Sequence, residues 1–170
     1  TIELLEMTTQ GDERLDVSLT KIGGKGVFVK ELETALYDGR ADLAVHSLKD
    51  VPMELPGGMD LCCLTARETP TDAVVHRAGT QAWDGFADIP QGTHLGTSSL
   101  RRIAQIRALR PDLKLSPVRG NLGTRLKKLD SGEFDGLVLA SAGLKRLELG
   151  DRVAFETAPE EILPACGQGI

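Results

Sequence analysis

Basic side chains recur in this chain at the points where an apolar strand is expected to give way to a helix. Ligands bind to open α/β sheets at these carboxyl ends of the strands, so cations there predict an anionic ligand. Arginine suits a carboxylate better than lysine does, because its planar guanidinium can donate two parallel hydrogen bonds. The cations concerned are Lys49, Arg101, Arg102, Arg119, Arg125, Lys145 and Arg146.

Three of these arginines stand where a helix favours an acidic residue. Arg101, Arg102 and Arg125 are expected in first turns, where a cation costs about 0.3–1 kcal/mol against the helix dipole. A bound carboxylate reverses the sign, because each charge-assisted hydrogen bond to it contributes about 1.5–3 kcal/mol. One such arginine alone is more often a solvated surface residue, but their recurrence predicts a ligand with several carboxylates. Neutral donors to the same anion are expected from Thr97, Ser98 and Ser99.

Asp50 places an acid among these cations. It follows Lys49 at the end of an apolar stretch, in a loop that Pro52 restricts. Surrounded by cations, its carboxyl is expected to be ionised at neutral pH, so it could accept a ligand N–H hydrogen bond or stabilise a developing cation. Its simpler role is to cap the turn or to pair with Lys49. No Ser-His-Asp or Cys-His arrangement in the sequence offers a stronger catalytic centre.

A glycine-rich stretch, residues 21–26, precedes the first predicted helix. It lacks the spacing and the final Lys-Ser/Thr of a phosphate-binding P-loop. Its glycines, with Lys21 and Lys25, instead favour a lid that closes cations over the site. Asp12 is expected to help hold that loop.

Short apolar strands alternate with helices along the chain, which predicts α/β architecture with largely parallel sheets. Strands are predicted at 2–7, 41–45, 72–75, 94–95, 113–118 and 137–140. Helices are predicted at 28–36, 100–109, 122–129 and 142–149. Gly39 is placed to end the first helix, Asn121 to cap the third at its N-terminus, and Gly132 to follow its end.

Two interruptions of the apolar pattern predict two lobes with a cleft between them. Charge and proline break the pattern at 67–71, and a second boundary is expected near 163–164. The predicted first domain comprises residues 1–67 plus 164–170, and the second comprises residues 71–163.

The composition argues against several classes of function. Hydrophobic residues make up 41% and charged ones 26%, as in a globular protein. The net charge of −5 gives no general attraction to nucleic acid, and no apolar run reaches the length of a membrane span. Three cysteines without partners at metal-ligand spacing predict a reducing, cytoplasmic setting and no metal site, with the adjacent Cys62 and Cys63 filling a core.

Six segments resemble porphobilinogen deaminases, and they occur along the whole chain in the family's order. They are residues 25–33 (KGVFVKELE), 45–52 (VHSLKDVP), 96–102 (GTSSLRR), 119–125 (RGNLGTR), 139–146 (LASAGLKR) and 163–169 (LPACGQG). The resemblance implies a fold like that of the periplasmic binding proteins, with two hinged α/β lobes followed by a third domain.

The resemblance also implies an activity. The family joins four porphobilinogen molecules head to tail, with release of ammonia, to give hydroxymethylbilane. Each pyrrole carries an acetate and a propionate, which agrees with a polycarboxylate ligand. The family's covalent primer is dipyrromethane, held by a cysteine in a Gly-Gly-Cys setting that none of Cys62, Cys63 and Cys166 has. The parent enzyme is expected to be a monomeric, cytoplasmic transferase.

Individual roles follow from the matched motifs. By resemblance, Asp50 is the catalytic carboxylate, which handles pyrrole N–H groups and the cationic intermediate formed as ammonia leaves. Lys21 and Lys25 match lysines of the family's lid loop. The residues that would contact carboxylates of the cofactor or substrate are Lys49, Ser99, Arg101, Arg102, Arg119, Arg125 and Arg146.

The chain also departs from the family. The opening strand and helix and the third domain are not found in it, so we expect the 170-residue chain alone not to turn over. One alternative function is a non-catalytic binding protein for a small polycarboxylate, which would gain nothing from the acid at Asp50. Another is a nucleic-acid module with residues 98–110 as a recognition helix, which the net charge of −5 disfavours.

Overall fold

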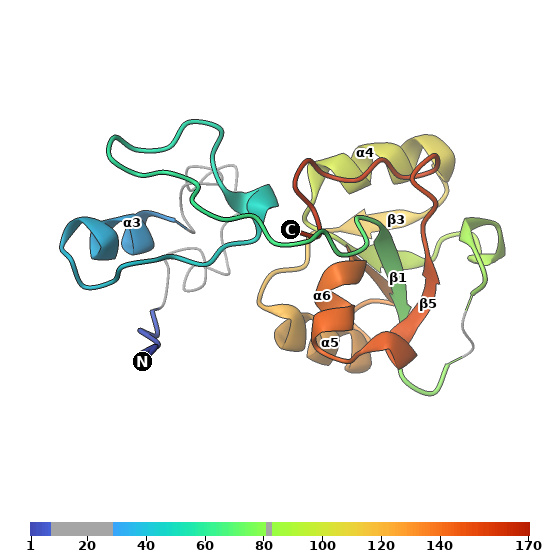
Figure 1. Cartoon of the computed structure of the whole chain (residues 1–170). Helices are drawn as coiled ribbons and strands as arrows, with labels where there is room; N and C mark the ends of the chain where they lie inside the picture. Colours follow the sequence, from blue (N-terminus) through green and yellow to red (C-terminus); the bar gives the residue numbers. More distant parts are fainter. Residues whose placement is uncertain (8–28, 81–82) are drawn as a thin grey trace. The chain divides into compact units, whose positions relative to one another are not determined.

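The computed structural model describes residues 1–7, 29–80 and 83–170 (Figure 1). The chain divides into two compact units, Thr1–Thr65 and Ala66–Ile170, which are described separately below. None of the helices among the described residues has the length and apolar character needed to cross a membrane.

The first unit contains one α-helix, α3 (Lys30–Tyr37), in its described part. Ala35 is its fully buried residue and lies on the apolar side that the sequence predicts. The helix ends where Gly39 takes a φ of +66°, a conformation that glycine adopts without strain. The predicted helix and its predicted end are therefore both confirmed. A short 3-10 helix, η2 (Leu48–Asp50), follows in the same unit.

Two strands predicted in this unit, at 2–7 and 41–45, are wrong. Both segments are irregular, and Val45 is 95% exposed. A strand needs a hydrogen-bonded neighbour, which alternation of apolar residues in one segment cannot supply. No neighbour pairs with either segment in the part of the unit that the structure describes. The predicted core role of Cys62 and Cys63 is also wrong, because both cysteines are exposed.

The second unit is built on a single five-stranded sheet with the strand order β3-β2-β4-β1-β5. The strands are β1 (Asp72–His76), β2 (His94–Gly96), β3 (Lys114–Ser116), β4 (Gly136–Ala140) and β5 (Val153–Glu156). Strand β2 pairs parallel with β3 and β4, whereas β1 pairs antiparallel with β4 and β5. The sheet is therefore mixed, and the expectation of a largely parallel sheet is wrong. Strand β5 is absent from the sequence prediction.

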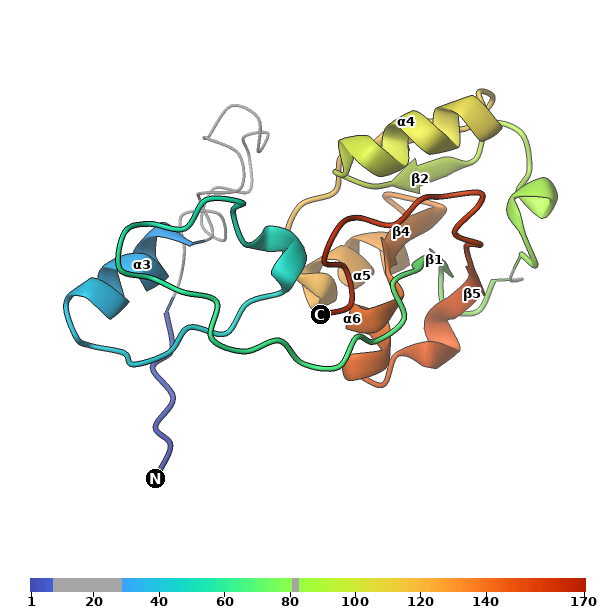
Figure 2. The ribbon, with the colours of Figure 1, turned by 45° about the horizontal axis from the view of Figure 1, so that its top comes forward.

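Helices cover both faces of this sheet. Figure 2 shows α4 (Leu100–Leu109) on one side, and α5 (Leu122–Asp130) and α6 (Ser141–Arg146) on the other. Alternate residues of the central strands enter the two cores. Ala73, Val75, Leu137 and Leu139 pack with Leu126, Leu129 and Leu144 of α5 and α6. Val74 and Val138 pack on the other face with Ile106 of α4 and with Ile162. Strands β1 and β4 are thus buried on both faces, which explains their unbroken apolar sequences.

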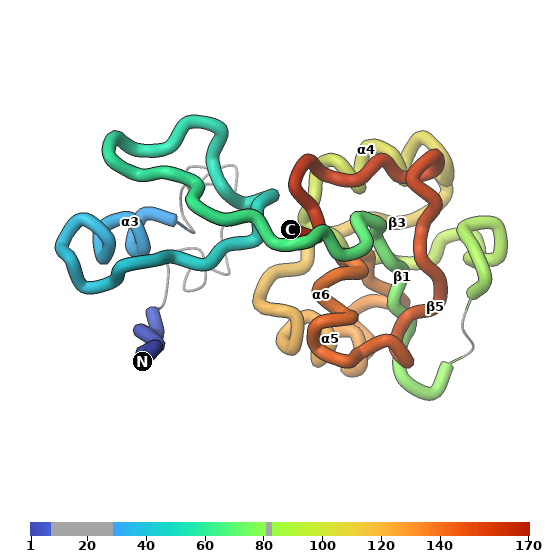
Figure 3. Tube along the Cα trace, in the orientation of Figure 1, coloured from blue at the N-terminus to red at the C-terminus, as the bar shows by residue number. Residues whose placement is uncertain are grey.

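The C-terminal segment runs along α4, as Figure 3 shows. The backbone N–H of Leu163 donates to Oε1 of Gln105 on that helix at 2.7 Å. The side-chain amide of Gln105 also lies 3.3 Å from the carbonyl oxygen of Leu163. These contacts attach residues around 163 to the second unit.

Leu137 tests the core of the second unit, because it is completely buried between β4 and the helices of one face. We expect Leu137→Ala to lower the free energy of unfolding by about 2–5 kcal/mol, through lost burial and the cavity left behind. Leu100→Ala on α4 is the control, since Leu100 is 67% exposed and should change the free energy by about 0.5 kcal/mol or less. Denaturant unfolding measures the free energy change of each variant. Equal changes for Leu137→Ala and Leu100→Ala would contradict the burial of Leu137 in this core.

Candidate functional site

The carboxyl ends of three strands lie at one edge of the second unit's sheet. Gly96 of β2 pairs with Ser116 of β3 and with Leu137 of β4, and all three strands run in the same direction. Strand β1 runs the other way, so its first residue, Asp72, pairs with the last residue of β4, Ala140. We call this side of the sheet the strand-end edge. The loops and helices that carry the predicted arginines of this unit begin here.

Asp72 lies at the centre of the strand-end edge and is completely buried. Its Oδ1 accepts hydrogen bonds from Nη2 of Arg102 at 2.7 Å and from Nε2 of Gln168 at 2.8 Å. Its Oδ2 lies 2.8 Å from Nη1 of Arg101. Sequence reasoning missed this acid. The signal that could have found it is a carboxylate at the head of the apolar run Ala73–Val75, where a charge needs a partner.

The surroundings of Asp72 keep it ionised. Burial alone would raise the pKa of this carboxyl, but hydrogen bonds from Arg102 and Arg101, with a further one from Gln168, outweigh burial and hold the pKa below its ordinary value of 3.8. In the folded chain Asp72 is therefore a carboxylate at neutral pH.

Arg101 and Arg102 differ in exposure although they are neighbours in α4. The Arg101 side chain is 23% exposed, and its Nη1 also donates to the carbonyl oxygen of Leu163 at 2.6 Å. The Arg102 side chain is 8% exposed, and its Nη1 donates to the carbonyl oxygen of Val138 at 2.9 Å. Two guanidiniums therefore meet one carboxylate. The predicted contacts of both arginines with a ligand remain predictions.

Gln168 joins the C-terminal segment to the start of β1. Besides Asp72, its buried side-chain amide donates to the carbonyl oxygen of Thr71 at 3.2 Å. The next residue, Gly169, accepts two hydrogen bonds at its carbonyl oxygen, from the backbone of Glu68 and from Nη2 of Arg146, both at 2.9 Å. Residues 66–72 and 167–169 are thus held together at the strand-end edge.

The residues after β2 are occupied with local hydrogen bonds. Thr97 is buried and its backbone N–H donates to Ser116 at 2.9 Å. The hydroxyl of Ser98 donates to the carbonyl oxygen of Val118 at 2.6 Å. The hydroxyl of Ser99 caps α4 by accepting from the backbone N–H of Arg102 at 3.4 Å. These contacts fix the loop, and the predicted role of the three residues as ligand donors remains a prediction.

The loop after β3 carries the next two predicted arginines. Gly120 has a φ of +110°, and a Cβ there would lie 2.6 Å from Thr124, so this turn requires glycine. Asn121 caps α5, as predicted, because its Oδ1 accepts from the backbone N–H of Thr124 at 2.9 Å. Nε of Arg125 donates to the carbonyl oxygen of Gly120 at 2.7 Å, which ties the guanidinium to the turn that follows Arg119.

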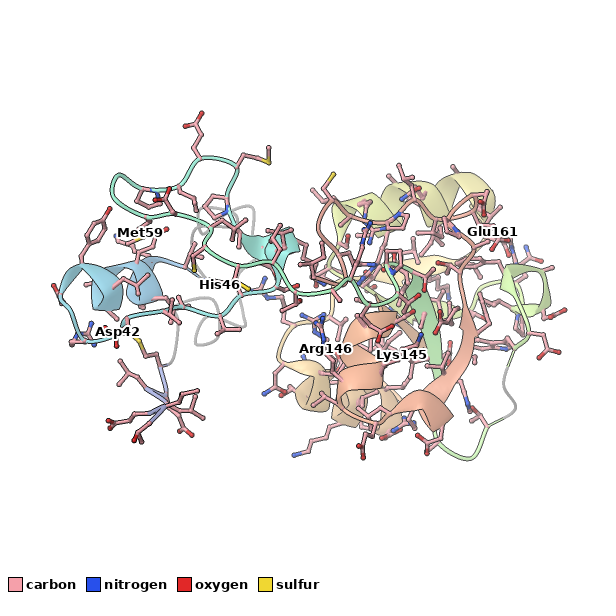
Figure 4. All side chains as sticks on the ribbon, viewed as in Figure 1. Asp42, His46, Met59, Lys145, Arg146 and Glu161 are labelled. Carbon is pink, nitrogen blue, oxygen red and sulfur yellow. The ribbon has the colours of Figure 1, made fainter. Side chains whose placement is uncertain are left out.

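Lys145 and Arg146 extend from the end of α6, which follows β4 (Figure 4). Nζ of Lys145 lies 3.7 Å from Oε1 of Glu68 and 3.5 Å from Oε1 of Glu156, so acidic side chains partly neutralise it. Arg146, in contrast, is bound to the backbone of Gly169. The structure thus brings Arg101, Arg102 and Arg146 into one connected set of hydrogen bonds.

The remaining predicted site residues belong to the first unit. Lys49 and Asp50 form the last two residues of η2 and are half-buried. The backbone N–H of Asp50 donates to the carbonyl oxygen of Ser47 at 2.9 Å, so the turn itself is well formed. The catalytic role of Asp50 remains a prediction. The lid-loop residues Asp12, Lys21 and Lys25 lie outside the described residues.

Replacing the buried acid tests the network. We expect Asp72→Asn to lower the free energy of unfolding at neutral pH by about 3–5 kcal/mol. The reason is that Arg101 and Arg102 would lose the carboxylate that neutralises them. The pKa of Asp72 is depressed by folding, so its contribution is present above 3.8 and is lost as the pH falls through the folded value. The difference in the free energy of unfolding between wild type and variant should therefore narrow as the pH falls below 3.8, as measured by denaturant unfolding. A difference that is constant with pH would contradict this assignment.

Comparison with known proteins gives a consistent set of relatives. The family described as "Porphobilinogen deaminase, dipyromethane cofactor binding domain" matches residues 1–170. Porphobilinogen deaminase of Chromobacterium violaceum is 60% identical over 169 residues, which cover 99% of this chain and 53% of that protein. Porphobilinogen deaminase of Albidiferax ferrireducens is 60% identical over 168 residues, covering 99% of this chain and 52% of that protein.

The chain thus spans about half the length of the curated relatives it matches. Among solved structures, an arginine-specific periplasmic binding protein of Salmonella typhimurium superposes with a TM-score of 0.43 and 16% identity. That superposition covers 56% of this chain and 43% of the other chain, and it is too weak to support an argument about fold or ligand.

Proposed function

The chain belongs to the porphobilinogen deaminase family, and we propose that it is the part of such an enzyme that binds the growing pyrrole chain and carries the catalytic acid. The whole protein would join four porphobilinogen molecules head to tail, with loss of ammonia at each step, to give hydroxymethylbilane. It would work as a cytoplasmic monomer. The two units would form two lobes with the site in a cleft between them.

The observation that carries this proposal is the arrangement at the strand-end edge of the second unit. Arg101 and Arg102 meet on the buried carboxylate of Asp72, and Arg146 is connected to them through the segment at 167–169. Two guanidiniums on one carboxylate leave one positive charge in excess. Because every pyrrole unit would bring two carboxylates, such an excess favours the growing chain.

The dipyrromethane cofactor fits the same donors. Its acetates and propionates are carboxylates, and the predicted contacts of this unit are arginines and hydroxyls, which donate to such groups. When bound, the cofactor would supply the primer to which pyrrole units are added. The residues we propose to hold cofactor or substrate carboxylates are Lys49, Thr97, Ser98, Ser99, Arg101, Arg102, Arg119, Arg125 and Arg146.

Asp50 is the proposed catalytic carboxylate. Its 3-10 turn presents a short acidic side chain that is half-buried, next to the cation of Lys49. As an ionised group it would accept a hydrogen bond from pyrrole N–H and stabilise the cation that forms as ammonia leaves. Lys21 and Lys25, with Asp12, would form a lid that excludes water during this step.

A chimera tests this proposal. The 170 residues replace the matching half of the Chromobacterium violaceum enzyme, and conversion of porphobilinogen is followed by release of ammonia. We expect the chimera to be active, and Asp50→Asn in it to lower kcat by about 100-fold or more, as loss of a positioned acid or base does. Asp42→Asn is the control in the same unit, because Asp42 is exposed (Figure 4).

The results separate catalysis from simple binding. If Asp50→Asn keeps full activity while the chimera works, Asp50 is not the catalytic group. If the chimera binds porphobilinogen tightly but releases no ammonia, the chain is better described as a polycarboxylate-binding protein, and the proposed function is wrong. Binding of the 170-residue chain to DNA with strong salt dependence would favour the nucleic-acid alternative instead.

A further inference from the structure

We propose that Asp72 is a positioning residue, which holds the guanidiniums of Arg101 and Arg102 in the orientation that receives a ligand carboxylate. This inference deepens the proposed function and rests on it for the identity of the ligand. Asp72 itself would touch neither cofactor nor substrate, because it is completely buried. Its role would be carried out through the two arginines.

The contacts of Asp72 divide between its two oxygens. Oδ1 is shared by Arg102 and Gln168, at 2.7 and 2.8 Å. Oδ2 faces Arg101 alone, at 2.8 Å from Nη1. Oδ1 therefore holds the guanidinium of Arg102 by a hydrogen bond, whereas Oδ2 makes no hydrogen bond and holds that of Arg101 by a close ion pair. One planar carboxylate thus contacts both guanidiniums. A neutral amide at this position could accept through only one of its two terminal atoms.

Arg101 is the member of the network that can meet a ligand. Its side chain remains 23% exposed, while Asp72 and Leu163 hold Nη1 and the side-chain oxygen of Gln168 lies 3.5 Å from Nη2. A long side chain held in this way has already lost most of its rotational freedom before a ligand arrives. Binding a carboxylate then costs less conformational entropy, which is the usual benefit of a preorganised site.

The charge of Asp72 explains how two arginines can be placed side by side at a helix N-terminus. Without an acid, their mutual repulsion and the helix dipole would both oppose this arrangement. With one carboxylate behind them, the set keeps a single excess positive charge. A ligand carboxylate would complete the neutralisation, so the acid holds the arginines in place while leaving the excess charge that binds an anion.

Arginine reactivity in the 170-residue chain tests the proposal directly. Wild type, Asp72→Asn and Asp112→Asn are treated with phenylglyoxal, and modification of each arginine is followed by mass spectrometry. Asp112 is the matched control: it pairs with Arg110 at 2.6 Å, at the other end of α4. We expect Asp72→Asn to accelerate modification of Arg101 several-fold, and Asp112→Asn to leave Arg101 unchanged.

Affinity for porphobilinogen, measured by calorimetry on the same three proteins, links the geometry to binding. We expect Asp72→Asn to raise the Kd for porphobilinogen by about tenfold, because the guanidinium of Arg101 is no longer held in place; this loss is equivalent to one charge-assisted hydrogen bond. The Kd of Asp112→Asn should stay close to that of wild type. Wild-type chain that fails to bind porphobilinogen would count against the proposed function. An unchanged rate of Arg101 modification in Asp72→Asn would overturn the positioning role whatever the ligand.

The wild-type chain supplies a second measurement, which decides the question even if Asp72→Asn does not fold. In ¹⁵N spectra of arginine side chains, a guanidinium held by several acceptors gives separate, slowly exchanging Nη signals. We expect such signals from Arg101 and Arg102. Averaged Nη signals for Arg101, like those of a solvated arginine, would overturn the proposal.

Discussion

The ion pair between a fully buried carboxylate and two adjacent arginines is the contact on which the second unit depends most. Asp72 connects the start of β1 with the first turn of α4, and Gln168 adds the C-terminal segment to the same carboxylate. Burying an ionised group is costly unless hydrogen bonds or opposite charges replace water. Here Oδ1 accepts two hydrogen bonds, and Oδ2 has the ion pair with Arg101. The network therefore requires all of its members at once, and the segments that carry them must come together in one arrangement.

The direction of β1 is what makes this possible. In an all-parallel sheet the first residue of a strand lies at the edge opposite to the ligand-binding loops. Because β1 runs antiparallel to β4, its first residue pairs with Ala140 and lies at the same edge as the loops after β2 and β3. The departure from a parallel sheet thus places an acid among the cations, where a parallel strand would have placed it far from them.

Local signals in the sequence predicted local structure correctly. Asn121 caps α5 and Gly39 ends α3, because a side-chain oxygen or a positive φ is used within a few residues of its position. Pairing between distant segments was not predictable in the same way. Apolar and polar residues alternate at 41–45 as they do in a strand, but this pattern does not identify a neighbouring strand for the segment to pair with. In the structure, Val45 is 95% exposed. Asp72 was missed for a related reason: its significance depends on arginines 29 and 30 residues further along the chain.

A site for a polycarboxylate faces a conflict between affinity and stability. Enough cations to bind the ligand repel one another when the ligand is absent, and this repulsion is strongest where water is excluded. The second unit resolves the conflict with an internal acid and with backbone carbonyls, since Arg102 also binds Val138 and Arg146 binds Gly169. Carbonyl oxygens hold a guanidinium in place without cancelling its charge. The arginines can therefore be fixed in the free protein and still carry the positive charge that a carboxylate ligand requires.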